Sequence, residues 1–337
     1  MSPTRRQVVK GGLVLAAATA SQGLKAAQAA AEIPRRPLGK TGLTVTALGI
    51  GGFHLGLPED AGIATRIVHE AIDHGVNFFD NAWEYNQGKS EERMGVALQG
   101  KRDKVVLMTK VCTHGRDKKT ALKQLEDSLR RLKTDHLDLW QVHEVVYWDD
   151  PERHFAKGGV IDALEEAKKA GKVRFTGFTG HKHPGIHLKM LEHGYAFDAV
   201  QMPLNCFDAS FRSFEQQVVP KALERGMAVL GMKSMGGRGQ PVLAGVVTAE
   251  EALRYAMSVP GIATTISGIQ TLEVLRQNLA VAHGFQPMAE AERKALRERV
   301  AEPAGDGRFE LYKTSMSYDA AEGRAQHGIP PPEELPL

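Results

Sequence analysis

The chain has 337 residues, with 43 Lys and Arg against 40 Asp and Glu, and 42% of its residues are hydrophobic. Four of the basic residues and none of the acidic ones lie within residues 1–31, so the rest of the chain has a formal charge of about −1, which excludes the basic excess that nucleic acids and anionic membranes attract. Its two cysteines are too few for a disulfide scaffold, and no Cys-x-x-Cys pair offers a zinc or redox centre.

The first segment has the pattern of a secretory leader. Arg5, Arg6 and Lys10 precede a mildly apolar stretch over 11–20, and an alanine-rich run over 26–31 offers Ala-x-Ala cleavage sites. This order is typical of a signal peptide, and the paired arginines resemble a bacterial twin-arginine export signal. The resemblance implies that the twin-arginine export machinery recognises residues 1–31 and that the mature protein is periplasmic or exported. A cytoplasmic location follows if the leader is not used.

Two other interpretations of the leader stay open, a transmembrane anchor and a disordered tail. Its apolar stretch of about ten residues is roughly half of what a membrane-spanning helix needs. No other segment of the sequence is apolar enough to span a membrane, so we expect no membrane span in the mature protein.

Beyond the leader, short β-branched segments alternate with longer amphipathic ones. A hairpin with a glycine turn is expected first, over 36–45, as a plug on the floor of the fold. Eight strands are predicted next, at 47–50, 78–80, 105–110, 137–143, 173–179, 199–202, 228–232 and 263–267. Each is followed by a predicted helix, at 61–74, 90–98, 120–132, 159–170, 186–193, 214–225, 249–258 and 271–282.

Eight strand–helix pairs without a linker predict an α/β fold, a single (β/α)8 TIM barrel. We place this domain at residues 32–302, including an added helix near 289–300, and expect residues 303–337 to form an irregular C-terminal tail. In such a barrel the active site lies where the strands end, so the residues at strand ends are the informative ones.

Four side chains of complementary chemistry fall at the ends of three successive strands. Asp80 ends the second strand and Tyr85 follows it, Lys110 ends the third, and His143 ends the fourth. This set resembles the catalytic tetrad of the aldo-keto reductase superfamily, and residues 88–91 (Gly-Lys-Ser-Glu) match that family's pattern as well. The resemblance covers about residues 35–285. It implies an NAD(P)(H)-dependent oxidoreductase that interconverts a carbonyl (aldehyde or ketone) and an alcohol, with Tyr85 as general acid and base.

The chemistry of these residue types supports the same hypothesis. Reduction of a carbonyl needs a hydride on carbon and a proton on the developing alkoxide. The Lys110 ammonium stabilises a phenolate, so we expect it to lower the pKa of Tyr85. Asp80 can keep Lys110 charged and oriented, and His143 can position the substrate oxygen. Each residue alone also fits a structural role, as an ion pair, a rim aromatic or a core histidine, but their joint placement favours catalysis.

The same resemblance implies that the cofactor is NADP(H) or NAD(H), with no metal. The matching positions after strands five to eight are Thr179, Gln201, Met232, Lys233, Ser234, Gly236, Gly237, Gly268, Gln270, Gln277 and Asn278. Met232 replaces the family's stacking aromatic residue, and Gln270 replaces a basic residue at the 2′-phosphate. The sequence therefore predicts a weak preference for NADPH over NADH, with Arg276 or Lys233 as substitute cations. The pair His181 and His183 lacks a nearby carboxylate in the sequence, so we do not expect a metal site there.

Loop residues at the barrel mouth are candidates for a substrate pocket with a flat, largely apolar lining. They are Phe53, His54, Trp83, Tyr147 and Trp148. In an alternative interpretation some of these aromatics pack against the C-terminal tail. The predicted substrate is a small-molecule carbonyl or alcohol. A nucleotide-binding redox sensor or regulatory subunit on the same fold is the alternative function, and a metal-dependent sugar isomerase requires more strand-end carboxylates than Asp80.

Overall fold

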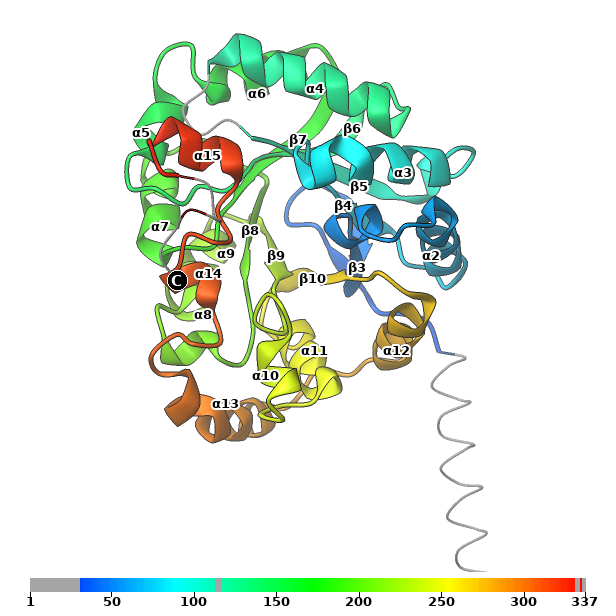
Figure 1. Cartoon of the computed structure of the whole chain (residues 1–337), viewed down its shortest axis with the longest axis vertical. Helices are drawn as coiled ribbons and strands as arrows, with labels where there is room; N and C mark the ends of the chain where they lie inside the picture. The colour runs from blue at the N-terminus through cyan, green and yellow to red at the C-terminus, as the bar shows by residue number, and fades with distance from the viewer. Residues whose placement is uncertain (1–30, 113–116, 331–333, 335–337) are drawn as a thin grey trace, which may run out of the picture.

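A closed barrel of eight parallel strands forms the centre of the computed structural model, which describes residues 31–112, 117–330 and 334 (Figure 1). The strands are β3 (Leu48–Gly51), β4 (Phe78–Asp80), β5 (Val106–Val111), β6 (Leu137–Val142), β7 (Val173–Thr179), β8 (Ala199–Pro203), β9 (Ala228–Met232) and β10 (Ile262–Gly268). β10 pairs with β3 and closes the ring. The predicted TIM barrel is confirmed, and each predicted strand end lies within one residue of the observed one.

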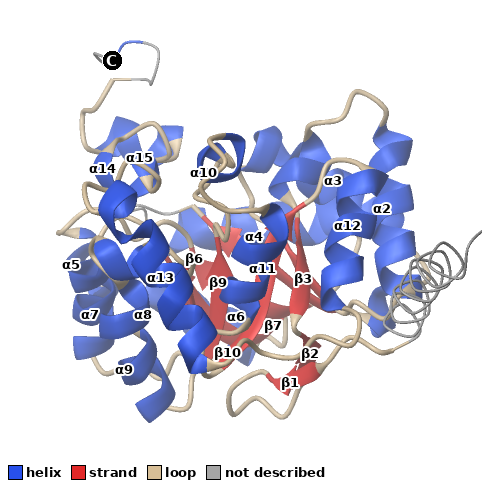
Figure 2. Ribbon diagram, turned by 90° about the horizontal axis from the view of Figure 1, so that it is seen from below, coloured by secondary structure: helices blue, strands red, loops and turns tan. Residues whose placement is uncertain are grey.

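Helices surround the barrel on its outside (Figures 1 and 2). They are α2 (Ala61–Asp73), α3 (Lys89–Ala97), α4 (Lys118–Leu132), α6 (Val160–Lys169), α7 (Pro184–Glu192), α8 (Phe214–Gln217), α9 (Val219–Glu224), α11 (Ala249–Met257) and α12 (Leu272–Ala282). The single helix predicted over 214–225 is in fact two, α8 and α9. Pro220 explains the break, because it has no N–H to bond the carbonyl four residues earlier.

Helix α4 shows how the local sequence sets these elements. The Asp117 side chain accepts a hydrogen bond from Thr120 N and so caps the first turn. Leu125, Leu129 and Leu132 lie on one face of the helix and are buried against the barrel. This leucine stripe is the pattern that predicts the helix from sequence.

The N-terminal hairpin closes one end of the barrel. β1 (Arg35–Pro37) pairs antiparallel with β2 (Thr44–Thr46). Leu38, in the turn after β1, and Val45, in β2, are fully buried. Both pack in the interior cluster of barrel side chains that includes Phe78. The predicted plug on the barrel floor is therefore confirmed.

The C-terminal part of the chain is more ordered than the sequence suggests. The helix predicted near 289–300 is α13 (Glu290–Ala304), and the expected irregular tail contains α14 (Leu311–Thr314) and α15 (Ala321–Gln326). Two further short helices, α5 (Asp150–Phe155) and α10 (Gln240–Leu243), follow β6 and β9. Figure 2 shows α10, α14 and α15 at the end of the barrel opposite the β1–β2 hairpin. The tail therefore lies over the end where an active site is expected.

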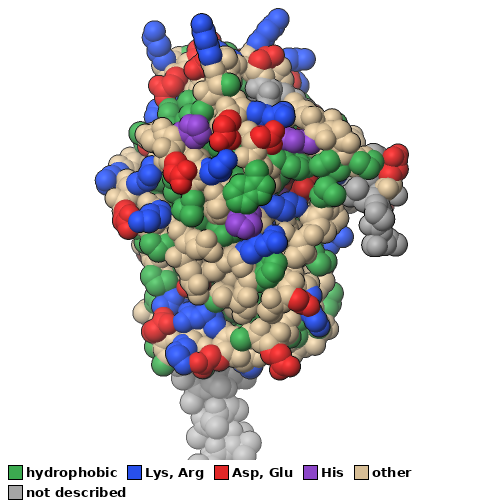
Figure 3. Space-filling view, turned by 90° about the vertical axis from the view of Figure 1, so that its left-hand side faces the viewer, with side chains coloured by type: hydrophobic (Ala, Val, Ile, Leu, Met, Phe, Trp, Pro, Cys, Tyr) green, Lys and Arg blue, Asp and Glu red, His purple; other side chains and the backbone are tan. Residues whose placement is uncertain are grey.

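The surface and the cysteines agree with the composition. On the face seen in Figure 3, basic and acidic side chains are interspersed rather than gathered into one charged patch. Cys112 and Cys206 are both buried and do not form a disulfide. Within the described part of the chain, no helix combines the length and the apolar character needed to span a bilayer.

The plug should contribute measurably to stability. We expect Leu38→Ala to lower the free energy of unfolding by about 2–5 kcal/mol, because Leu38 is fully buried and its truncation leaves a cavity. The matched control is Leu243→Ala, which removes the same atoms from a residue that is 85% exposed and should change stability by less than about 0.5 kcal/mol. Urea denaturation of the three proteins gives the comparison. Equal losses in both variants would contradict a structural role for the hairpin.

Candidate active site

The carboxyl ends of β4 and β5 bring a buried ammonium group together with its acceptors. Lys110 Nζ forms an ion pair with Asp80 Oδ1 and donates to Asn81 O at 2.7 Å and to Tyr85 Oη at 3.2 Å. The Lys110 side chain is fully buried. Its three contacts match the three N–H donors of an ammonium group, so none of them is left without an acceptor. Burial raises the pKa of Asp80 above its usual value, against the opposing effect of Lys110.

A tight turn after β4 directs Tyr85 toward this group. In the 3-10 turn η2 (Tyr85–Gly88), Asn86 and Gln87 have φ values of 51° and 59°, in the left-handed region that non-glycine residues rarely adopt. The Asn86 side-chain amide holds the turn by donating to Phe53 O at 2.7 Å. A strained backbone of this kind persists only where surrounding contacts fix it, and here it fixes the phenol at the barrel mouth.

The electrostatic environment of Tyr85 differs from the expectation. Burial, followed by the negative charges of Asp80, Glu84 and Glu144, raises the pKa of Tyr85 well above its usual value. The direction is opposite to the one expected from Lys110 alone. Asp80 offsets the charge of Lys110, and the two glutamates add negative potential, so the phenol stays protonated at neutral pH.

His143 packs against the ring of Tyr85. Its ring packs edge-on against the Tyr85 ring, with centroids 5.5 Å apart and an interplanar angle of 76°. A carboxylate oxygen of Glu84 contacts Nδ1 of His143. Glu84 is not among the residues predicted for the site from the sequence, although it directly precedes Tyr85. The structure thus brings all four predicted catalytic residues together and adds a carboxylate to them.

Three of the five predicted pocket residues lie near Tyr85 or beside the predicted dinucleotide site. Phe53 is 44% exposed and its ring packs edge-on against that of Tyr85, with centroids 5.4 Å apart. Trp83 is half-buried, and the guanidinium of Arg131 lies over its ring at 5.6 Å. The ring centroids of His54 and Phe53 are 5.5 Å apart. The His54 ring also lies so close to Gly268 that a Cβ at that position would collide with it.

The other two pocket residues pack elsewhere. The ring of Tyr147 stacks on that of His327 in the tail, with centroids 3.8 Å apart. Its hydroxyl donates a hydrogen bond to Asp319 Oδ2 at 3.3 Å. Trp148 is 53% exposed and its ring lies against His183 at 5.0 Å. The alternative interpretation therefore holds for Tyr147, which supports the C-terminal tail, and Trp148 packs at the start of α7.

The predicted nicotinamide contacts line the barrel next to the ion pair. Thr179 and Gln201 are directly opposite each other in β7 and β8, and each is 1% exposed. Gln201 Nε2 contacts Met232 Sδ at 3.6 Å, and Gln201 also lowers the pKa of Asp80 by hydrogen bonding, although burial outweighs that effect. The buried Oε1 of Gln201 accepts no hydrogen bond from the described residues. An acceptor in this position fits the amide N–H group of a nicotinamide.

The loop after β9 is covered by the C-terminal tail. Gly236 and Gly237 have φ values of 72° and 87°, which only glycine adopts without strain. The ammonium of Lys233 lies over the rings of Tyr312 and Tyr318 at 5.4 Å and 5.6 Å. Burial lowers the pKa of Lys233 to about 8. Lys233 thus contacts the tail, which is not predicted from the sequence.

The predicted adenine side carries little positive charge. Gln270 and Gln277 are exposed, whereas Asn278 is buried and donates to Ser267 Oγ at 2.9 Å. Arg276, a candidate substitute cation, is held by both carboxylate oxygens of Glu70 at 2.7 Å and 3.1 Å. Its charge is therefore already compensated.

The two histidines considered as metal ligands have protein partners or neighbours. His181 is buried and lies 3.5 Å from Asp319 of the tail. His183 accepts a hydrogen bond from Gly185 N at 3.0 Å and caps α7. Over the described ranges, no group of three potential ligands includes either histidine.

Comparison with known proteins extends the similarity beyond the four site residues. A model of the Aldo/keto reductase family matches residues 47–239. In Bacillus subtilis (strain 168), the uncharacterized oxidoreductase YqkF is 26% identical over 324 residues, covering 84% of this chain and 99% of that protein. The uncharacterized oxidoreductase YrpG of the same organism is 31% identical over 245 residues, covering 64% and 72%. The holo structure of aldo-keto reductase AKR11C1 from Bacillus halodurans has a TM-score of 0.67 at 26% identity, covering 80% of this chain and 96% of that one.

Proposed function

Because the chain belongs to the aldo/keto reductase family and is an NAD(P)H-dependent oxidoreductase, we propose that it interconverts an aldehyde or ketone and an alcohol, with Tyr85 as the general acid and base. The observation that carries this proposal is the contact of 3.2 Å between the Lys110 ammonium and the Tyr85 hydroxyl. Lys110 donates to the phenol oxygen, which leaves the phenol proton available to a substrate oxygen. Bound NAD(P)H supplies the hydride.

The raised pKa of Tyr85 favours the reductive direction. A protonated phenol can donate to the developing alkoxide, which is a far stronger base than a phenolate. As the proton leaves Tyr85, the phenolate gains the attraction of the adjacent Lys110 ammonium. Asp80 keeps that ammonium aimed at the phenol, and His143 borders the position of the substrate oxygen. Alcohol oxidation would need the phenolate first, which burial and the surrounding carboxylates disfavour.

For the cofactor we propose that Thr179, Gln201 and Met232 hold the nicotinamide and that residues 233–237 approach the pyrophosphate. Gly268, Gln270, Gln277 and Asn278 form the adenine side. The buried Oε1 of Gln201 and the left-handed glycines of the loop support this assignment. Phe53, Trp83 and His54 would border the bound carbonyl.

Replacement of Tyr85 tests the assigned mechanism. We expect Tyr85→Phe to lower kcat/KM for reduction of simple aldehydes by about 10²–10⁴, because the proton donor is lost, while dinucleotide binding is retained. The control is Tyr195→Phe, which removes a partly exposed hydroxyl that donates to Glu165. The oxidation of NAD(P)H is monitored by its absorbance, which gives kcat/KM for each variant. Equal rates in wild type and Tyr85→Phe would overturn the mechanism, and binding without turnover in the wild type would favour a redox sensor.

The exposed Gln270 leads to a second expectation, on cofactor preference. A contact between a phosphate and a lysine or arginine is worth roughly 1.5–3 kcal/mol, about 10- to 150-fold, and glutamine offers only a neutral hydrogen bond. We therefore expect NADPH to bind less than about 30-fold more tightly than NADH. Fluorescence titration with both cofactors measures the ratio. A ratio above about a thousandfold would mean that another cation contacts the 2′-phosphate.

For the leader, which lies almost wholly outside the described residues, we propose a twin-arginine signal that directs the protein to the periplasm. The paired arginines and the alanine-rich cleavage sites support this. In a bacterium with the twin-arginine machinery, the wild type should appear in the periplasmic fraction in shortened form. A variant with Arg5→Lys and Arg6→Lys should stay in the cytosol at full length. Full-length wild-type protein confined to the cytosol would contradict the proposal.

A further inference from the structure

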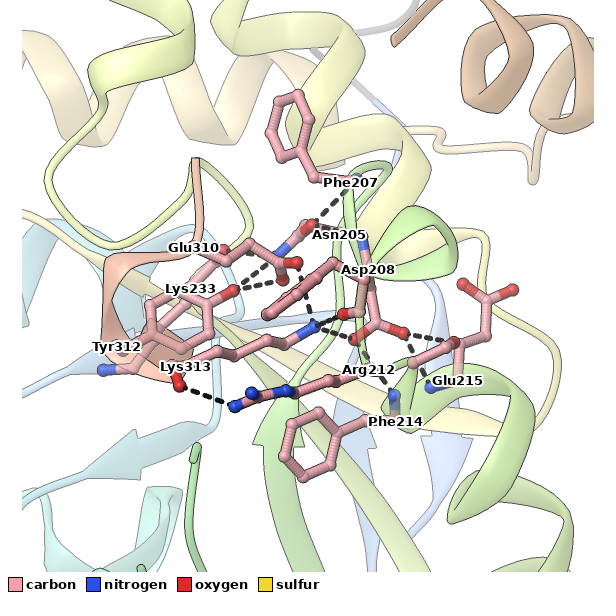
Figure 4. Close-up of polar contacts among 12 residues, drawn as sticks. Asn205, Phe207, Asp208, Arg212, Phe214, Glu215, Lys233, Glu310, Tyr312 and Lys313 are labelled. Atoms are coloured by element: carbon pink, nitrogen blue, oxygen red, sulfur yellow. Dashed lines mark hydrogen bonds and ion pairs between the residues drawn. The ribbon is translucent and has the colours of Figure 1, made fainter. Parts of the chain in front are cut away.

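A cluster of buried charges fastens the C-terminal tail to the barrel (Figure 4). Lys313 of α14 is completely buried, and its ammonium contacts Asp208 Oδ1 at 2.8 Å, Glu310 Oε2 at 2.9 Å and Phe211 O at 2.7 Å. All three N–H donors of Lys313 are therefore used. Asp208 belongs to the loop after β8, so this cation joins two parts of the chain that lie 105 residues apart.

The two carboxylates of the cluster are also satisfied. Asp208 accepts hydrogen bonds from Ser213 Oγ at 2.6 Å and from the backbone N–H of Glu215 at 2.9 Å. Glu310 accepts from the Tyr312 hydroxyl at 2.6 Å. Removal of one member would leave a buried charge without a partner, which is strongly unfavourable. The cluster therefore holds the tail in one arrangement on the barrel.

Asn205 connects this cluster to the loop after β9. Its side-chain amide donates to Tyr312 Oη at 2.9 Å and to the backbone oxygen of Lys233 at 3.2 Å (Figure 4). Its Oδ1 accepts from Phe207 N at 2.9 Å. One side chain thus holds the tail and the predicted pyrophosphate loop at the same time.

The tail also packs directly on that loop. A Cβ at Gly236 would lie 2.4 Å from the backbone oxygen of Phe309, and one at Gly237 would lie 3.1 Å from the ring of Tyr318. Beyond the loop, the tail has a second anchor at Asp319, which pairs with Lys182 at 2.7 Å. Residues 309–320, which we call the C-terminal strap, are therefore fixed on both sides of the loop over residues 233–237.

We propose that Lys313 and Asn205 are positioning residues of the dinucleotide site, which fasten the C-terminal strap over the loop at residues 233–237 and thereby slow the release of bound dinucleotide. The proposal rests on the proposed function, since it takes this loop as a dinucleotide contact. A loop packed beneath a docked strap cannot open without displacing it. By linkage, bound dinucleotide and the docked strap stabilise each other.

The release rate of NADPH tests the proposal. Loaded enzyme is mixed with excess NADP⁺ in a stopped-flow instrument, and the loss of nicotinamide fluorescence is recorded. We expect Lys313→Met to release NADPH at least about tenfold faster, which corresponds to about 1.4 kcal/mol of lost coupling. The KM for NADPH should rise while the KM for the carbonyl stays unchanged. The matched control is Lys294→Met, which removes an exposed lysine paired with Glu298 on α13.

A second variant keeps the test decisive if Lys313→Met does not fold. Tyr318→Ala removes the ring that covers Gly237 and leaves the charge cluster intact, so it should also release NADPH at least about tenfold faster. In the wild type, bound dinucleotide should slow hydrogen exchange in peptides from residues 309–320. Release rates within about twofold of wild type in the folded variants, or no change in exchange, would overturn the strap while leaving the reductase assignment intact. A wild type that binds neither NADPH nor NADH would overturn both.

Discussion

The buried ammonium of Lys110 is the constraint on which the barrel mouth depends. A charge removed from water costs several kcal/mol unless its donors are satisfied, and here Asp80, Asn81 and Tyr85 satisfy them. These acceptors come from the end of β4 and the turn after it, so neither the register of β4 with β5 nor the strained turn can shift freely. The contact that stabilises the mouth is the same one that aims the phenol.

Burial, followed by the carboxylates around Tyr85, raises the pKa of the phenol and keeps it protonated. Lys110 alone would favour the phenolate, but its charge is shared with Asp80, and Glu84 and Glu144 add negative potential. Burial acts in the same direction, because it disfavours a charged phenolate. In the proposed mechanism, this protonated phenol gives a proton to a reduced carbonyl more readily than it takes one from an alcohol. Glu84 also contacts His143, so a single acidic residue acts on both the phenol of Tyr85 and the imidazole of His143.

A second buried lysine organises the opposite part of the mouth by the same principle. Lys313 is fully buried and has three acceptors, two of them in the segment after β8. Through Asn205 this cluster reaches the loop after β9, so the tail and two barrel loops form one polar unit. The proposed strap and the proposed export are compatible, because slow release would keep the dinucleotide on a protein that is exported in a folded state. Catalytic and cofactor sides of the mouth would then each depend on one buried cation.

The sequence alone determined the barrel and the placement at its mouth of four residues, Asp80, Tyr85, Lys110 and His143. Strands and amphipathic helices have periodic sequence patterns, and the carboxyl ends of parallel strands lie at one end of the barrel. These local patterns were therefore sufficient to predict that the four side chains lie close together. Only the tertiary structure decided the direction of the Tyr85 pKa shift and the placement of the tail. The Tyr85 shift depends on burial and on the summed field of several charges, which no single spacing encodes. Lys313 and Asp208 lie 105 residues apart in the sequence, and Tyr147 and Asp319 lie 172 residues apart, so each pair forms only when the chain folds into the barrel.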